Sequence, residues 1–296
     1  MKKGKFPELE KKARWVRQTV LEMALAAGAG HVAPAYSCTD ILVALYQGGA
    51  LRVDPKNPKW DNRDRFILSK GQSCAAQYAV LADMGYLPVS ELQTYCQLGS
   101  KLGGHSESNV SGVEAFTGSL GHGFPIGAGM ALAAKMDKKD YITVVMVGDG
   151  EIQEGSNWEA AMFASQHKLN NLIVIVDRNK LQAIDFTANA LDVEPFKDKW
   201  EAFGFEVKTV NGHSFDEMIP MFKKFRNRKS KKPLCIIANT TKGKGVSFMQ
   251  NKTIWHFRIP AGAEIEQARK ELYGKDYDPN KLPKIKACPD TTGKGY

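Results

Sequence analysis

Two segments of the chain carry oxygen-bearing side chains at a spacing that suits a divalent cation and a diphosphate. Asp149 lies between two glycines, and Asn179 ends the triplet that begins at Asp177. Mg²⁺ prefers oxygen ligands, usually one or two from the protein and the rest from phosphate and water. Asp149 offers a carboxylate and Asn179 an amide oxygen, while Gly148 and Gly150 let the backbone approach an anion without an intervening Cβ. The two segments therefore predict a site for a metal ion and a diphosphate.

The elements around these residues explain how the two segments could meet. The apolar, β-branched run from Tyr141 to Val147 stops at the Gly-Asp-Gly turn, as a buried parallel strand does. The stretch between Gly150 and Asn179 is long enough for a helix and a second strand that return the chain to the same sheet edge. In open α/β sheets ligands collect at that edge, where helices present their amino termini to anions.

Hydrophobic periodicity extends this pattern over most of the chain. Strands alternate with helices, which predicts a doubly wound, mostly parallel α/β sheet with helices on both faces. Strands are predicted at residues 65–68, 142–147, 172–177, 206–210 and 234–239. Helices are predicted at residues 7–27, 37–47, 73–84, 89–97, 121–136, 155–168, 195–203 and 215–229.

Glycine-rich motifs across the chain resemble the amino-terminal half of a transketolase, a thiamine-diphosphate enzyme. The Asp149 and Asn179 segments are similar to the signature of thiamine-diphosphate proteins. The other motifs follow in the family's order: Gly28-Ala29-Gly30-His31, Asp64–Gly71, Leu98-Gly99-Ser100, Gly104-His105, Glu114, Thr117–Gly123, Thr240–Gly245 and Trp255-His256. The resemblance runs from about residue 10 to 260 and implies the thiamine-diphosphate-binding fold.

The resemblance also implies roles for particular residues. Asp149, Asn179 and the main-chain oxygen of Leu181 would hold Mg²⁺, or Ca²⁺ or Mn²⁺ in its place. The coenzyme would contact Gly118, Leu120, Gly148, Asp149, Gly150, Glu151, Glu159, Asn179 and His256. Residues expected to act on the substrate or its protons are His31, Gln72, His105, Glu154 and His256. In the family, the acids that match Glu154 and Glu159 link the two coenzyme sites through glutamates of the partner subunit. A helix amino terminus that favours acids is an equally good explanation for both residues.

The chain departs from the family pattern at several positions. Gln72 stands where the family has a His that faces the substrate, and Gln cannot carry a proton charge near neutral pH. Val32 and Ala33 replace a frequent Pro-Gly pair, and Phe257 replaces a Gly. These changes predict a narrower pocket and an unusual donor ketose.

Length predicts an incomplete enzyme. We expect a thiamine-diphosphate (diphosphate and Mg²⁺) binding domain at residues 1–260 and an extension at 261–296 that packs on a partner subunit.

Too few residues follow the last predicted strand for a second doubly wound sheet. In the family that missing domain presents a glutamate to the aminopyrimidine ring. The chain is therefore expected to work with a separately encoded C-terminal transketolase subunit, as an α₂β₂ heterotetramer. Together they would transfer a two-carbon ketol unit from a phosphorylated or similarly anionic ketose to an aldose.

Composition narrows the remaining classes. The chain has no apolar run near the ~20 residues that span a bilayer, and its five cysteines form no CxxC pair. Both observations favour a cytoplasmic protein with no membrane partner. The net charge of +9 is densest at residues 223–232, which we interpret as a solvated helix end, with no nucleic acid partner.

Two other functions remain open from the sequence. The α subunit of a 2-oxo acid dehydrogenase or a deoxyxylulose-phosphate synthase would carry a similar metal loop, although the Leu-Gly-Ser, Gly-His and Thr-Gly-Ser-Leu-Gly motifs favour transketolase. The chain could also be a non-catalytic scaffold or regulatory protein that binds the coenzyme, because Gln72 replaces the expected His.

Overall fold

The computed structural model describes residues 4–280 and residue 285, and its centre is a parallel sheet of five strands. The strands are β1 (Arg65–Leu68), β2 (Thr143–Gly148), β3 (Leu172–Arg178), β4 (Glu206–Asn211) and β5 (Leu234–Asn239). Their order across the sheet is β1-β2-β3-β5-β4, and every neighbouring pair is parallel. All five predicted strands are confirmed, and with them the α/β fold.

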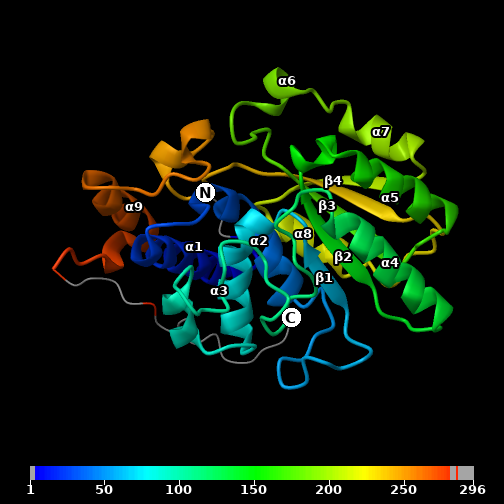
Figure 1. The fold of residues 1–296 in the computed structure, drawn as a ribbon, viewed down its shortest axis with the longest axis horizontal. Helices are drawn as coiled ribbons and strands as arrows, with labels where there is room; N and C mark the ends of the chain where they lie inside the picture. The colour runs from blue at the N-terminus through cyan, green and yellow to red at the C-terminus, as the bar shows by residue number, and fades with distance from the viewer. Residues whose placement is uncertain (1–3, 281–284, 286–296) are drawn as a thin grey trace.

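Helices cover both faces of this sheet (Figure 1). They are α1 (Pro7–Ala27), α2 (Val32–Tyr46), α3 (Cys74–Met84), α4 (Gly123–Met136), α5 (Gly155–Gln166), α6 (Thr187–Ala190), α7 (Phe196–Ala202), α8 (Phe215–Phe222) and α9 (Ala263–Tyr273). Short 3₁₀ helices are η1 (Gly71–Ser73), η2 (Val89–Thr94), η3 (Glu151–Gln153), η4 (Ser247–Met249), η5 (Thr253–Trp255) and η6 (Gly274–Asp276).

Alternating strand residues belong to two separate hydrophobic cores. Val144 and Met146 of β2 pack in one core with α1, α2, α3 and α8, whereas Val145 and Val147 pack in the other with α4, α5 and α7. A strand places successive side chains on opposite faces, so a strand that is apolar throughout must be covered on both. This explains why the central strands β2 and β3 have almost continuous runs of β-branched residues.

Several predicted helix boundaries are wrong. Helix α2 begins at Val32 instead of residue 37, because Pro34 is tolerated in a first turn, where its missing N–H would have no helical partner. The segment predicted as a helix at 89–97 forms only the 3₁₀ helix η2. Helices α6 and α9 were not predicted.

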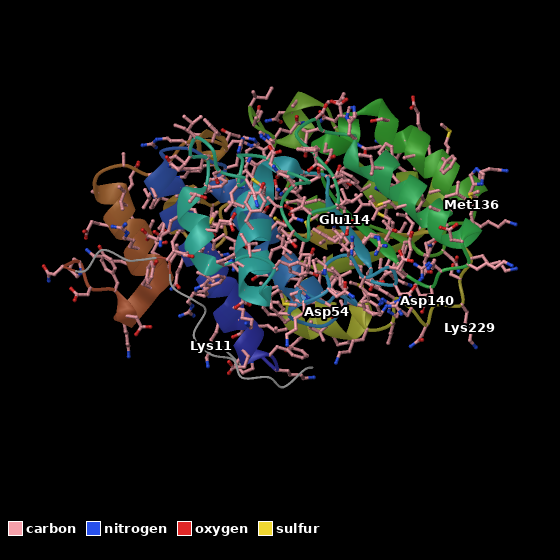
Figure 2. The ribbon with its side chains drawn as sticks, turned by 60° about the horizontal axis from the view of Figure 1, so that its bottom comes forward. Lys11, Asp54, Glu114, Met136, Asp140 and Lys229 are labelled. Carbon is pink, nitrogen blue, oxygen red and sulfur yellow. The ribbon has the colours of Figure 1, made fainter. Side chains whose placement is uncertain are left out.

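The basic segment 223–232 differs most from its prediction. Helix α8, which contains Pro220, ends at Phe222, seven residues before the predicted end. Beyond it, the Arg226 guanidinium pairs with the buried Asp64 carboxylate, while Lys229 projects from the edge of the molecule (Figure 2). Part of this segment therefore anchors the chain instead of extending a solvated helix.

The first part of the predicted extension packs on the same chain. Ala268 and Leu272 of α9 enter the core beside α1, and the Arg269 guanidinium lies 2.7 Å from the Glu22 carboxylate. The predicted boundary at residue 260 and the contact of the extension with a partner stay predictions, and residues 281–284 and 286–296 lie outside the described part. Among the described residues, no helix is long and apolar enough to cross a membrane.

Candidate active site

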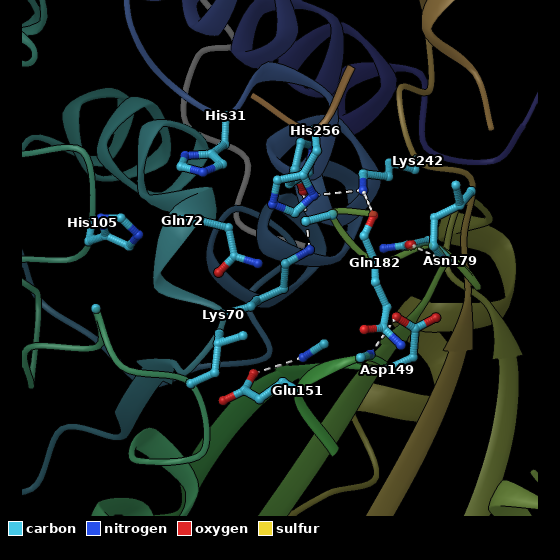
Figure 3. Close-up of a pocket in the computed structure, with 17 residues that line it drawn as sticks. His31, Lys70, Gln72, His105, Asp149, Glu151, Asn179, Gln182, Lys242 and His256 are labelled. Carbon is cyan, nitrogen blue, oxygen red and sulfur yellow. Dashed lines mark hydrogen bonds between the residues drawn. The ribbon is translucent and has the colours of Figure 1, made fainter. Parts of the chain in front are cut away.

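A cavity of about 300 Å³ opens at the carboxyl ends of β2 and β3 (Figure 3). Most of the site residues predicted from the sequence line it: His31, Gln72, His105, Gly118, Leu120, Gly148, Asp149, Gly150, Glu151, Asn179, Leu181 and His256. Five further residues, for which no role was predicted, also line it: Pro34, Lys70, Gln182, Ala183 and Lys242. The cavity therefore brings together loops that span more than two hundred residues of sequence.

Strand register explains why the two oxygen-bearing segments converge. Gly148 pairs with Asp177 across β2 and β3, so Asp149 and Asn179 both follow at the same sheet edge. The Asp149 Oδ1 atom accepts a hydrogen bond of 2.8 Å from the Gly150 amide, and its Oδ2 atom accepts one from the Lys180 amide. The Asn179 side chain accepts a 3.0 Å bond from the Leu181 amide. The predicted metal ligands thus lie in two neighbouring loops that are joined by the hydrogen bond from the Lys180 amide to Asp149.

The charge on Asp149 suits a cation. This side chain is 2% exposed, and burial together with the nearby Asp177 carboxylate raises the pKa of Asp149 to about 7. Its hydrogen bonds come from backbone amides, which carry no full charge. A divalent cation would supply the missing positive charge, and the carboxylate, amide and carbonyl oxygens are the hard ligands that Mg²⁺ takes. The residues present therefore fit a magnesium ion.

Unpartnered polar atoms face the same space. The buried Nδ1 atom of His31, Oε1 of Gln72 and Nε2 of Gln182 have no hydrogen-bond partner in the described structure. Since buried polar groups normally find partners, such atoms indicate a ligand or water. At Gly150 an added Cβ would lie 2.9 Å from the Gln182 side chain, which would have to shift. These features fit a polar coenzyme.

Three histidines gather on one side of the cavity. The His31 ring centroid lies 5.6 Å from that of His105 and 5.3 Å from that of His256. Burial, followed by neighbouring charges, lowers the pKa of His31 to about 4 and that of His256 to about 3. Both imidazoles are therefore neutral near pH 7. The exposed ring of Phe257 has its centroid 4.8 Å from that of His31, and the narrower pocket expected from this departure stays a prediction.

Lys242 is a cavity residue within the Thr240–Gly245 motif, and the sequence predicted no individual role for it. Its ammonium donates to the Gln182 carbonyl at 2.7 Å and lies 2.8 Å from the His256 Nδ1 atom. Because an ammonium only donates, Nδ1 of His256 accepts and its proton is on Nε2. Burial, followed by the charge of Lys70, lowers the pKa of Lys242 to about 8. This side chain offers positive charge beside Asp149.

Lys70 forms an ion pair beneath the cavity. Its side chain and that of Asp177 are almost completely buried, and the ammonium contacts the Asp177 carboxylate directly. The same carboxylate accepts a 2.6 Å hydrogen bond from the Ser37 hydroxyl and one from the Thr240 hydroxyl. The pair links α2, β3 and the loop after β5.

The three predicted glutamates have different surroundings. Glu151 is buried, and its carboxylate accepts hydrogen bonds of 2.9 Å from the Gly121 and Gly148 amides. Burial raises the pKa of Glu151. Glu151 thus connects two cavity loops, and both oxygens of its carboxylate already accept hydrogen bonds from within the chain. Glu154 and Glu159 are exposed and do not line the cavity. Their predicted roles, which require a partner, stay predictions.

The fold and the site together define a coenzyme-binding α/β domain. The family model described as "Transketolase, thiamine diphosphate binding domain" matches residues 10–287. The chain belongs to the transketolase family. Among its relatives, one subunit of the apulose-4-phosphate transketolase of Phocaeicola vulgatus is 42% identical over 264 residues, which cover 89% of this chain and 93% of the relative.

Other comparisons agree. The 6-deoxy-6-sulfo-D-fructose transketolase subunit SqwG of a Clostridium species is 41% identical over 250 residues, covering 84% of this chain and 90% of that subunit. The crystal structure of transketolase from Campylobacter jejuni matches with a TM-score of 0.85 and 34% identity, covering 93% of this chain. The match covers only 44% of that transketolase. The chain therefore spans less than half of a transketolase of that kind and nearly all of the relatives that are named as transketolase subunits.

Proposed function

We propose that this chain is the N-terminal subunit of a two-subunit transketolase that transfers a two-carbon ketol unit from a ketose to an aldose. The observation that carries the proposal is the cavity in which Asp149, Asn179 and three histidines converge. The length supports it, because relatives named as transketolase subunits are matched almost from end to end.

Asp149, Asn179 and the Leu181 carbonyl would hold Mg²⁺, and Gly150 and Lys242 would face the diphosphate. Thiamine diphosphate, when bound, supplies the thiazolium chemistry that stabilises the two-carbon unit during transfer. The chain itself supplies the orientation and the local charge. Lys70 keeps the Asp177 carboxylate paired, so that the negative charge near the metal loop is not increased.

The neutral imidazoles suit the handling of sugar protons. His31 has a lowered pKa and an unpartnered Nδ1 atom, so it can accept a hydrogen bond from a hydroxyl and take up its proton during the reaction. His256, whose Nδ1 atom accepts from Lys242, can donate a hydrogen bond to a sugar oxygen from Nε2. His105 lies on the same side of the cavity. Gln72, with an unpartnered carbonyl oxygen, can bind a hydroxyl but cannot move a proton. We propose an anionic ketose as donor, since the named substrates of two relatives carry a phosphate or a sulfo group.

A second subunit would complete the site. Large apolar side chains near the cavity mouth are strongly exposed, with Ile184 at 81%, Ile254 at 62% and Phe257 at 58%. Ile184 directly follows the cavity residue Ala183, and Phe257 directly follows the cavity residue His256. Ile254 stands two residues before His256. Exposed apolar patches of this kind mark interfaces. We propose that a separately encoded C-terminal subunit covers them in an α₂β₂ assembly. The four described cysteines are free thiols, which favours a reducing compartment and hence the cytoplasm.

The proposal is tested by isolating the tagged chain gently from its own cells and assaying ketol transfer from a ketose phosphate to an aldose. We expect activity in the material that retains the second subunit, with little from the chain alone. The matched control is Asp149→Ala, which should remove activity from the same assembly. A lone chain with full activity would contradict the split enzyme. An intact assembly that binds thiamine diphosphate without any transfer activity would favour a binding scaffold.

A further inference from the structure

His213 lies outside the cavity, yet it holds the loop that carries Lys242. The residue follows β4, and its ring lies between two groups distant in sequence. Its Nδ1 atom is 2.6 Å from the Asp40 carboxylate of α2, and its Nε2 atom is 2.8 Å from the Thr241 amide nitrogen. Thr241 immediately precedes Lys242. This connects a helix on one side of the sheet with a cavity residue.

The two contacts determine the tautomer of His213. A backbone N–H can only donate, so Nε2 must accept from Thr241 and the ring proton must be on Nδ1, where it is donated to Asp40. An imidazole in this form is neutral and uses both nitrogens. A side chain of similar size without two nitrogens could fill the space, but it could not make both bonds.

Asp40 is itself held in place. Arg17 of α1 donates to both of its oxygens, at 3.0 and 2.6 Å, and also donates to the Tyr36 carbonyl at 3.1 Å. Arg17 and Asp40 are 7% and 5% exposed. Burial alone would raise the pKa of Asp40, but Arg17 and His213 hold it at about 2. The carboxylate is therefore a fixed negative acceptor for the His213 proton.

Further contacts show that the segment 211–213 and the loop after β5 fit closely. The Gly212 amide donates to the Asn239 carbonyl at 2.8 Å. A Cβ at Gly212 would lie 2.5 Å from the Thr240 methyl group, so only glycine permits this approach. At the other end of the loop, a Cβ at Gly245 would lie 3.1 Å from the Arg17 side chain. His213 and Arg17 thus lie against the two ends of residues 240–245.

We propose that His213 is a positioning residue that, with Asp40 and Arg17 behind it, fixes the Thr241 amide and so directs Lys242 into the coenzyme cavity. The identity of the ligand in this inference rests on the proposed function, whereas the hydrogen bonds of His213 do not depend on it. Lys242 contacts the Gln182 carbonyl and His256, so a shift of its backbone would disturb both. The ligand class concerned is a diphosphate bound with Mg²⁺.

The test compares three variants of the chain by hydrogen exchange of the Thr241 amide, measured by NMR without coenzyme. His213→Phe keeps the volume and removes both bonds, so exchange should accelerate by up to about tenfold, the value of one hydrogen bond. His213→Gln places an acceptor near the Nε2 position and should restore most of the protection. His213→Asn reaches only toward Asp40 and should behave like the Phe variant.

Two controls separate a local effect from general loosening. The Val174 amide, in the central strand β3, should keep its exchange rate in all variants, and thermal unfolding checks that each variant folds. Binding of Mg²⁺ with inorganic diphosphate, measured by calorimetry, should weaken in the Phe and Asn variants and recover in the Gln variant. If the Phe variant does not fold, the Gln and Asn pair gives the same comparison.

Unchanged protection of Thr241 in the Phe or Asn variant would overturn the inference. So would equal diphosphate binding by the Gln and Asn variants. Neither result depends on ketol transfer. A failure of the proposed transketolase activity with the exchange pattern intact would therefore leave the role of His213 standing and remove only the reaction.

Discussion

Two buried aspartates, on either side of the loop after β5, have opposite electrostatic surroundings. Asp149 faces the cavity, is bonded by backbone amides, and has a pKa raised to about 7. Asp40 lies behind the loop, is paired with Arg17 and His213, and has a pKa lowered to about 2. The negative charge of Asp40 is balanced by Arg17 within the chain, whereas the charge of Asp149 requires a bound cation. An aspartate thus serves two purposes in this molecule. Asp40 helps to fix the loop after β5, and Asp149 faces the cavity, where its charge depends on a bound ligand.

The largest effect should come from breaking the support beneath the cavity. Lys70→Met leaves the Asp177 carboxylate buried without its cation, which should lower the free energy of unfolding by about 3–5 kcal/mol. Chemical denaturation of the metal-free chain measures this loss. The double variant Lys70→Met, Asp177→Asn should recover much of it, and an equally unstable double variant would show that the ion pair is not the cause.

Changing the cavity aspartate should affect binding and leave folding intact. Asp149→Asn should weaken binding of Mg²⁺ with thiamine diphosphate by more than the roughly 10- to 100-fold typical of residues that only orient a ligand. In the metal-free wild type the raised pKa means that the folded chain keeps a proton that the unfolded chain has released. Stability should therefore fall as the pH rises from about 4 to 7. The variant should lack the Asp149 part of this fall, and an unchanged slope would contradict our view of this charge.

Asp40 should show the opposite pH dependence. Its folded pKa of about 2 lies below the usual value of about 3.9. The stabilisation it gives is therefore complete above about pH 4 and is lost as the pH falls toward 2; it amounts to about 2 kcal/mol. The difference in unfolding free energy between the wild type and Asp40→Asn should shrink between pH 6 and pH 3. A constant difference would mean that Arg17 does not stabilise the charged form.

At the cavity mouth, Ile184→Ser should hardly change the isolated chain, because an exposed residue contributes within about 0.5 kcal/mol. It should weaken assembly with the second subunit by roughly 10- to 150-fold, since burying such a side chain contributes about 1.5–3 kcal/mol. The matched control is Met136→Ser at the far end of α4, where the side chain is 73% exposed. A larger effect of the Met136 variant on subunit titrations would place the interface elsewhere.

The smallest expected effect concerns Gln72. Gln72→His restores the family's side chain at the cavity wall. Coenzyme binding should stay the same, and the KM for the donor ketose should change by no more than about tenfold, the value of one hydrogen bond. Steady-state kinetics on two ketose phosphates measure this. A loss of coenzyme binding would show that Gln72 acts on the coenzyme and not on the sugar.

Local patterns explain what could be predicted from the sequence. The central strands β2, β3 and β5 are largely apolar runs rich in β-branched residues. The residues that directly follow two neighbouring parallel strands lie at the same edge of the sheet, as Asp149 and Asn179 do. A role for Lys242 could have been predicted, since this residue stands in the Thr240–Gly245 motif. A role for His213 could not, because its partner Asp40 is 173 residues away in the sequence and no motif contains both residues. Beyond the early end of helix α8, Arg226 forms an ion pair with Asp64, a tertiary contact that hydrophobic periodicity does not contain.

The most direct test of the central claim is native mass spectrometry of the tagged chain after gentle isolation from its own cells. We predict a complex with a second chain of comparable size, which holds thiamine diphosphate and a divalent cation. The same measurement on Asp149→Ala should show the complex without the coenzyme. A lone chain with no coenzyme would contradict the account of a split transketolase.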